Sequence, residues 1–230
     1  MPIEDQYREW EETGRQWVGN LMPTLRGHGC LWHRCTVEGL QGIVRAGEIR
    51  PAGEGTEKSC VTDCQAHRLG AVPLFDFDTP SEREVYRAAK MGWAGFLNEN
   101  RQCITIWLRV PVGHLDPTKL VIQGTEATLN NPLVYHGFKW IPWVEAWHPG
   151  PIAWAHVDQV WAARKPYGGG DYNMTPLDLA DPVPEAQALR REWDEDWERR
   201  RAADRAEGKI DIAEALEAAR ARRFLVEPGE

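Results

Sequence analysis

The chain has 230 residues, which is long enough for one domain with a substantial hydrophobic core and a helical appendage. Its formal charge of -8 disfavours binding through a broad basic surface, although a local groove can still be basic. Trp supplies 12 residues against 5 Tyr and 5 Phe, and this bias predicts wide, partly exposed aromatic surfaces.

The cysteine count and the first residues of the chain indicate the cellular compartment in which the protein is expected. There are 5 cysteines, an odd number, and the opening Met-Pro-Ile-Glu-Asp lacks the charged and apolar regions of a signal peptide. No apolar run approaches the roughly 18 residues that a membrane span requires. We therefore expect a soluble, cytoplasmic protein with free thiols and no membrane partner.

The N-terminal third begins with helical spacing of bulky residues. An amphipathic helix is predicted within residues 1–27, with a break near Gly14. A short strand at 31–34 follows, and Thr36 is placed to cap a helix that Gly47 ends.

The middle of the chain alternates between helix and strand signals. The apolar run at 71–77 contains Pro73, so a strand there is expected to be short or at a sheet edge. Ser81 and Glu84 form a capping box for a helix that reaches residue 98. Further strands are predicted at 103–110, 115–122, 143–147 and 157–162. The expected class is α+β.

A glycine-rich segment at 167–172 marks the boundary of the predicted core, which spans 28–166. Residues 167–230 are expected to form a hinge and two charged helices. The glycines lack the Lys-Ser/Thr pair of a phosphate-binding loop.

Two widely separated segments carry the strongest functional signal. The first is Leu-Trp-His-Arg-Cys-Thr at 31–36, and the second is Trp-Ile-Pro-Trp-Val-Glu at 140–145. Together they resemble the two ends of the NAD-binding core of the ADP-ribosyltransferase superfamily. Within that superfamily, the two segments most resemble those of the DNA-modifying toxins and the RNA 2'-phosphotransferases. The resemblance covers roughly residues 28–165 and implies a split mixed or antiparallel sheet with flanking helices and a C-terminal helical extension.

The resemblance implies NAD as a substrate and assigns roles to residues at both ends. Glu145 would bind the nicotinamide ribose and stabilise the ribosyl cation, while His33 would orient the dinucleotide. Arg34 would meet the pyrophosphate, and Thr36 would touch the ribose or cap the following helix. The hydroxyl that such families carry on an intervening strand is assigned to Ser59 or Thr62.

Each key residue also has a simpler interpretation. His33 alone fits a strand histidine with satisfied hydrogen bonds, and Glu145 alone fits an edge-strand carboxylate that points into water. The functional interpretation depends on their joint occurrence in the expected order. NAD cleavage needs a fixed carboxylate near the sugar because its transition state resembles an oxocarbenium ion.

The acceptor of ADP-ribose is expected to be a macromolecule, with a nucleic-acid base, in DNA or RNA, favoured over protein. Trp143 stands two residues before Glu145, where arginine-modifying members of the family have Glu, so that activity is disfavoured. Asn131, Tyr135 and Trp143 are the candidate acceptor-binding residues. The expected role is that of a toxin, a defence factor or a phage-borne modifier.

A rival hypothesis is a non-catalytic interaction protein on the same fold, with the Trp-bearing C-terminal helices as its contact surface for a protein partner. A metal site is not predicted. The available ligands lack the usual Cys-x-x-Cys spacing of zinc sites. These are Cys30, His33, Cys35, Cys60, Cys64 and His67.

Overall fold

The structure is a computed structural model, and it describes residues 3–51, 65–91, 104–122, 141, 143–164 and 171–208. The chain forms two compact units, Met1–Arg190 and Arg191–Glu230. The first unit contains the sheet and the helices that pack on it. The second of the two charged helices expected within residues 167–230 lies outside the described residues.

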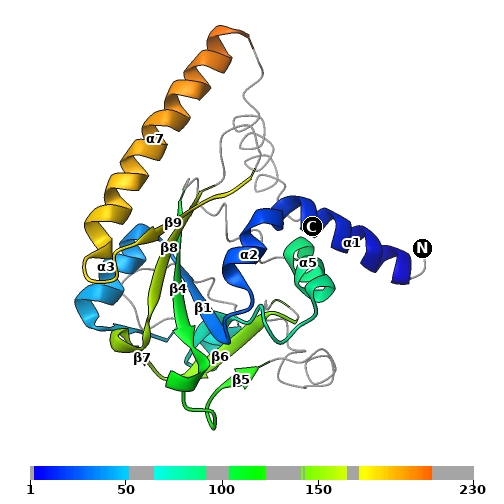
Figure 1. Cartoon of the computed structure of the whole chain (residues 1–230), viewed down its shortest axis with the longest axis vertical. Coiled ribbons are helices and arrows are strands. Elements are labelled where there is room, and N and C mark those ends of the chain that lie inside the picture. Colours follow the sequence, from blue (N-terminus) through cyan, green and yellow to red (C-terminus); the bar gives the residue numbers. More distant parts are fainter. Residues whose placement is uncertain are drawn as a thin grey trace, which may run out of the picture. The chain divides into compact units, whose positions relative to one another are not determined.

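A seven-stranded sheet with the order β5-β6-β3-β1-β4-β8-β9 organises the first unit (Figure 1). All of its neighbouring strands are antiparallel. Its members are β1 (Cys30–Cys35), β3 (Ala71–Phe75), β4 (Thr105–Pro111), β5 (Val121–Ile122), β6 (Glu145–Pro149), β8 (Gln159–Arg164) and β9 (Asn173–Leu177). A smaller antiparallel pair joins β2 (Glu48–Ile49) and β7 (Ile152–Ala153).

Two helices, Val37–Ala46 and Glu82–Met91, begin at the capping signals that the sequence carries. Thr36 Oγ1 accepts from the backbone N–H of Gly39 at 3.0 Å, and Ser81 and Glu84 form the reciprocal capping box. Within the described residues the α-helices are α1 (Ile3–Val18), α2 (Met22–Leu25), α3 (Val37–Ala46), α4 (Gln65–Arg68), α5 (Glu82–Met91) and α7 (Pro182–Ala206). The 3₁₀ turns are η1 (Gly19–Leu21), η4 (Val112–His114) and η5 (Trp154–His156). The predicted α+β class is confirmed.

The main hydrophobic core lies between one face of the sheet and helices α1, α2 and α5. Trp32 and Trp107 are fully buried in it, and Trp147 is buried elsewhere on the sheet. The expectation of broadly exposed Trp surfaces is therefore wrong for these three residues. Their large apolar area is removed from water, which stabilises the sheet–helix packing.

The predicted break near Gly14 is also wrong, because α1 runs through this residue without interruption. Gly14 is buried where α1 crosses α5, and the two helices lie side by side (Figure 1). A Cβ at this position would stand 1.8 Å from the backbone oxygen of Tyr86. Glycine is thus required here for close helix packing and does not end the helix.

Pro73 lies in a short strand, as expected, but that strand is not at the sheet edge. β3 lies between β6 and β1. A residue in a strand directs its N–H and C=O to the same side, and the Pro73 carbonyl faces β1, where it binds the His33 ring. The N–H that Pro73 lacks would therefore also face β1, at a point where the backbone ladder has opened.

Some boundaries differ from the sequence expectation. The segment predicted as a strand at 115–122 pairs only at Val121–Ile122. β9 follows the glycine-rich segment and pairs with β8, so the sheet continues beyond residue 167. Pro176 in β9 masked its strand character, and an edge strand tolerates a proline because one side of its backbone is unpaired.

We expect Gly14→Ala to lower the free energy of unfolding by about 3 kcal/mol, because the new methyl group overlaps the backbone of α5. The matched control is Gly42→Ala in α3, where no atom lies within 4 Å of the new Cβ. This second change should stabilise the protein by about 0.5–1 kcal/mol through helix propensity. Urea denaturation measures both, and equal effects would contradict the packing role of Gly14.

Candidate functional site

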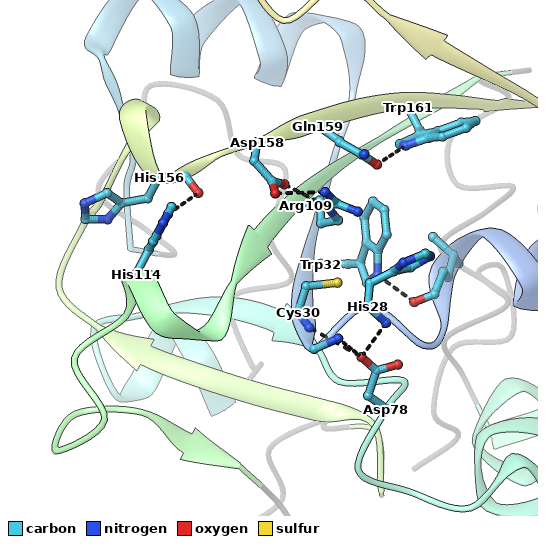
Figure 2. Close-up of polar contacts among 12 residues, drawn as sticks. His28, Cys30, Trp32, Asp78, Arg109, His114, His156, Asp158, Gln159 and Trp161 are labelled. Carbon is cyan, nitrogen blue, oxygen red and sulfur yellow. Dashed lines mark hydrogen bonds and ion pairs between the residues drawn. The ribbon is translucent and has the colours of Figure 1, made fainter.

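The start of β1 is held by the carboxylate of Asp78, which follows β3 in the chain. It accepts hydrogen bonds from four successive backbone N–H groups at 2.5–3.3 Å (Figure 2). The donors are Gly27, His28, Gly29 and Cys30. Gly27 and Gly29 have positive φ angles of 86° and 59°, which lets consecutive N–H groups converge on one anion. The strand that carries His33 is thus anchored at its first residue.

His33 occupies the gap between β1 and β3. The two strands pair at Trp32 and Phe75, and one residue further on the imidazole replaces the backbone contact. Its Nδ1 lies 2.9 Å from the Pro73 carbonyl oxygen. A carbonyl can only accept, so Nδ1 carries the proton and Nε2 of the neutral ring is left as an acceptor.

Burial lowers the pKa of His33 to about 4. The hydrogen bond to the Pro73 carbonyl acts in the opposite direction and is outweighed, while the charge of neighbouring Arg34 lowers the pKa further. The ring is therefore neutral at pH 7. In this state His33 can accept a hydrogen bond from a ligand hydroxyl but cannot act as an acid.

Glu145 begins β6 and is 7% exposed. Its Oε2 accepts from the backbone N–H of Ile141 at 2.7 Å, and its Oε1 accepts from Trp147 Nε1 at 2.8 Å. These two donors compensate for the removal of the carboxylate from water. Glu145 is therefore a buried and fixed carboxylate and does not point into solvent.

The turn before Glu145 has an unusual backbone. Trp143 has a φ of 67°, in the left-handed region that non-glycine residues seldom occupy. The backbone N–H of Glu145 closes the turn on the Ile141 carbonyl at 3.2 Å. The Trp143 side chain is 7% exposed and packs edge-on against Tyr7, with ring centroids 6.3 Å apart. Core packing thus holds the turn that positions the carboxylate.

β3 separates the strands that carry His33 and Glu145. Trp32, Phe75 and Glu145 form one row across β1, β3 and β6, so their side chains share a face. His33 is the next residue on β1 and leaves this row on its other side. The structure therefore brings the two strands close together but places the side chains of His33 and Glu145 on opposite faces of the sheet.

The other candidate residues are distributed as follows. Arg34 is half-buried on β1, and alternation places it on the face that Trp32 and Glu145 share. Thr36 uses its hydroxyl to cap α3. The remaining candidates, Ser59, Thr62, Asn131 and Tyr135, lie outside the described residues.

Asp76, which directly follows β3, was not among the predicted residues. It is 2% exposed, and its backbone N–H donates to the Val144 carbonyl at 2.6 Å, beside Glu145. Its Oδ1 accepts from two backbone N–H groups, and its Oδ2 is buried without a hydrogen-bond partner in the described part of the chain. Asp76 stands between Phe75 and Phe77. A carboxylate within an apolar segment is also what drew attention to Glu145, so the same pattern could have identified Asp76 from the sequence.

Comparison with protein-family models, with curated proteins and with solved structures finds no match for this chain. Among the helices within the described residues, none is long and apolar enough to cross a membrane.

The low pKa of His33 predicts a specific pH dependence of stability. An unfolded histidine binds a proton near pH 6.5 and the folded ring only near pH 4, so the unfolded state gains protons first as the pH falls. The free energy of unfolding should therefore fall by about 2 kcal/mol between pH 7 and pH 5. Denaturant titrations at both pH values measure this change.

The control variant is His33→Asn, whose side-chain amide can still donate to the Pro73 carbonyl but does not titrate. It should lose about 2 kcal/mol less than the natural protein over the same pH interval. An identical pH dependence in both proteins would show that His33 is not a buried neutral histidine.

Proposed function

We propose that this chain is an NAD-dependent ADP-ribosyltransferase that transfers ADP-ribose to a macromolecular acceptor, with a nucleic-acid base favoured over protein. The sequence support is the resemblance of the segments around His33 and Glu145 to the two ends of that superfamily's core. The observation that carries the proposal is the fixed, buried Glu145 carboxylate on β6, which β3 alone separates from the strand of His33.

The proposed reaction breaks the bond between nicotinamide and C1' of the ribose. Nicotinamide leaves with the bonding electron pair, and the ribose acquires oxocarbenium character. The carboxylate of Glu145 would stabilise this positive charge. A nucleophilic atom of the acceptor then bonds to C1' and releases its proton.

The neutral state of His33 suits an orienting role. Its Nε2 would accept a hydrogen bond from a ribose hydroxyl while Nδ1 remains bound to the Pro73 carbonyl. Arg34 shares a sheet face with Glu145, which supports a role for its guanidinium at the pyrophosphate. His33 leaves the face of the sheet opposite to Glu145, so it would contact a different part of the dinucleotide, while Arg34 and Glu145 on their shared face would hold the glycosidic bond beside the carboxylate.

The central test is nicotinamide release from NAD by the purified protein, alone and with DNA, RNA or cell lysate added. Glu145→Gln should lower the rate about 10²–10³-fold, because the variant lacks the charge that stabilises the ribosyl cation. Glutamine retains one acceptor oxygen, but its amide NH₂ must face one of two donors, so the melting temperature is measured alongside. The matched control is Glu48→Gln, a partly exposed glutamate on β2 that pairs with Arg50, and it should retain full activity.

A folded Glu145→Gln variant with full activity would exclude the proposed role of Glu145. No nicotinamide release under any condition, together with no NAD binding by calorimetry, would favour the rival interaction protein. Release that requires one added acceptor would identify the substrate class.

A further inference from the structure

An open groove of about 540 Å³ lies between α1 and α5. This volume is within the range of ligand pockets. Its lining is unusually rich in arginine for a chain of formal charge -8. Four arginines line it, namely Arg8 and Arg15 from α1 and Arg83 and Arg87 from α5. We call this feature the arginine groove.

Three of these guanidinium groups converge on one carboxylate. Glu11 lies 3.5 Å from Arg15, 3.5 Å from Arg83 and 3.9 Å from Arg87. Its side chain is only 16% exposed, whereas those of Arg15 and Arg83 are 56% and 74% exposed. One carboxylate neutralises one of the three positive charges, and the excess charge faces solvent. Exposed ion pairs of this length contribute little stability, so the arginines can turn towards an incoming anion.

Two further glutamates, Glu4 and Glu12, line the groove and are exposed. They reduce the positive potential at the rim but make no ion pair with Arg83 or Arg87 among the described contacts. The lining of the groove thus carries four arginines against three glutamates, and Asp5, beside the groove, pairs with Arg8 at 3.9 Å.

A chain of side-chain contacts connects the groove to the turn before Glu145, the candidate catalytic residue. The Arg87 guanidinium carbon lies 4.9 Å from the centre of the Tyr7 ring. Tyr7 in turn packs edge-on against Trp143, two residues before Glu145. A ligand in the groove would therefore lie against the same packed side chains that hold the turn of Glu145.

We propose that the arginine groove binds the sugar-phosphate backbone of a single-stranded nucleic acid. Guanidinium groups match the phosphate oxygens in a bidentate geometry, and a groove with exposed positive charge can follow the backbone of a strand. The inference rests on the proposed function in one respect, since it names the strand as the acceptor of ADP-ribose. A strand bound here would present an unstacked base near the turn of Glu145.

Fluorescence anisotropy with fluorescein-labelled twelve-nucleotide oligonucleotides, one of DNA and one of RNA, tests the inference without NAD. The variant Arg15→Gln with Arg83→Gln should weaken binding about 10-fold or more and make the affinity less dependent on salt. Both side chains are more than half exposed, so the fold should persist. The matched control is Arg199→Gln with Arg200→Gln on α7, which removes the same charge and should change the affinity less than about 2-fold.

A third variant should change the affinity for the oligonucleotides in the opposite direction. Glu11→Gln removes the carboxylate shared by three guanidinium groups and should tighten oligonucleotide binding about 3-fold or more at low salt. A nonspecific charge effect would weaken both double variants equally, and that result would overturn the inference. So would weaker binding by Glu11→Gln, or no oligonucleotide binding by the natural protein.

Polyglutamate serves as a second labelled probe. If it binds with the same arginine dependence and the oligonucleotides do not, the groove takes an acidic protein and the inference is wrong. The outcome is separable from the proposed activity. Acceptor-dependent nicotinamide release without oligonucleotide binding at these arginines would contradict the proposed role of the groove but not the transferase activity. Oligonucleotide binding in the groove without nicotinamide release would contradict the transferase activity but not the role of the groove.

Discussion

The candidate site depends on how β3 contacts its two neighbours. Phe75 pairs with Trp32 on one side and with Glu145 on the other, which fixes the distance and register between the two segments of interest. Pro73 has no N–H to continue the ladder towards β1, and the His33 ring binds its carbonyl in the resulting gap. The Pro73 carbonyl therefore determines which tautomer the histidine adopts, whereas burial of the ring keeps it uncharged.

The carboxylates in this region accept hydrogen bonds mainly from backbone N–H groups. Asp78 takes four main-chain N–H groups, and Glu145 takes one together with an indole N–H. Hydrogen bonds to charged groups are among the stronger stabilising contacts in proteins, so these carboxylates order the turns around them. Asp76 differs, because one of its oxygens is buried without a partner in the described structure. A functional site is a place where such an incomplete compensation is commonly found.

Charge is distributed in a way that the total does not reveal. The chain is acidic, yet α1 and α5 place four arginines around one groove. This arrangement depends on Gly14, since only a residue without a side chain lets the two helices approach at Tyr86. Helix packing and surface charge are thus linked, and the close contact that stabilises the core also concentrates the guanidinium groups of residues far apart in the sequence.

Local signals in the sequence determined much of the secondary structure: the cap at Thr36, the box at Ser81 and the strands predicted at 103–110 and 157–162 appear within a few residues of the expected positions, because they depend on neighbouring residues. The sequence also indicated an acid of interest at Glu145, since a carboxylate in an apolar segment is costly without a task. Only the tertiary structure decided that β3 is central, that Gly14 is a packing contact, and which groups compensate each charge. His33 finds its acceptor 40 residues away, and no local pattern encodes a partner that the folding of the sheet brings into place.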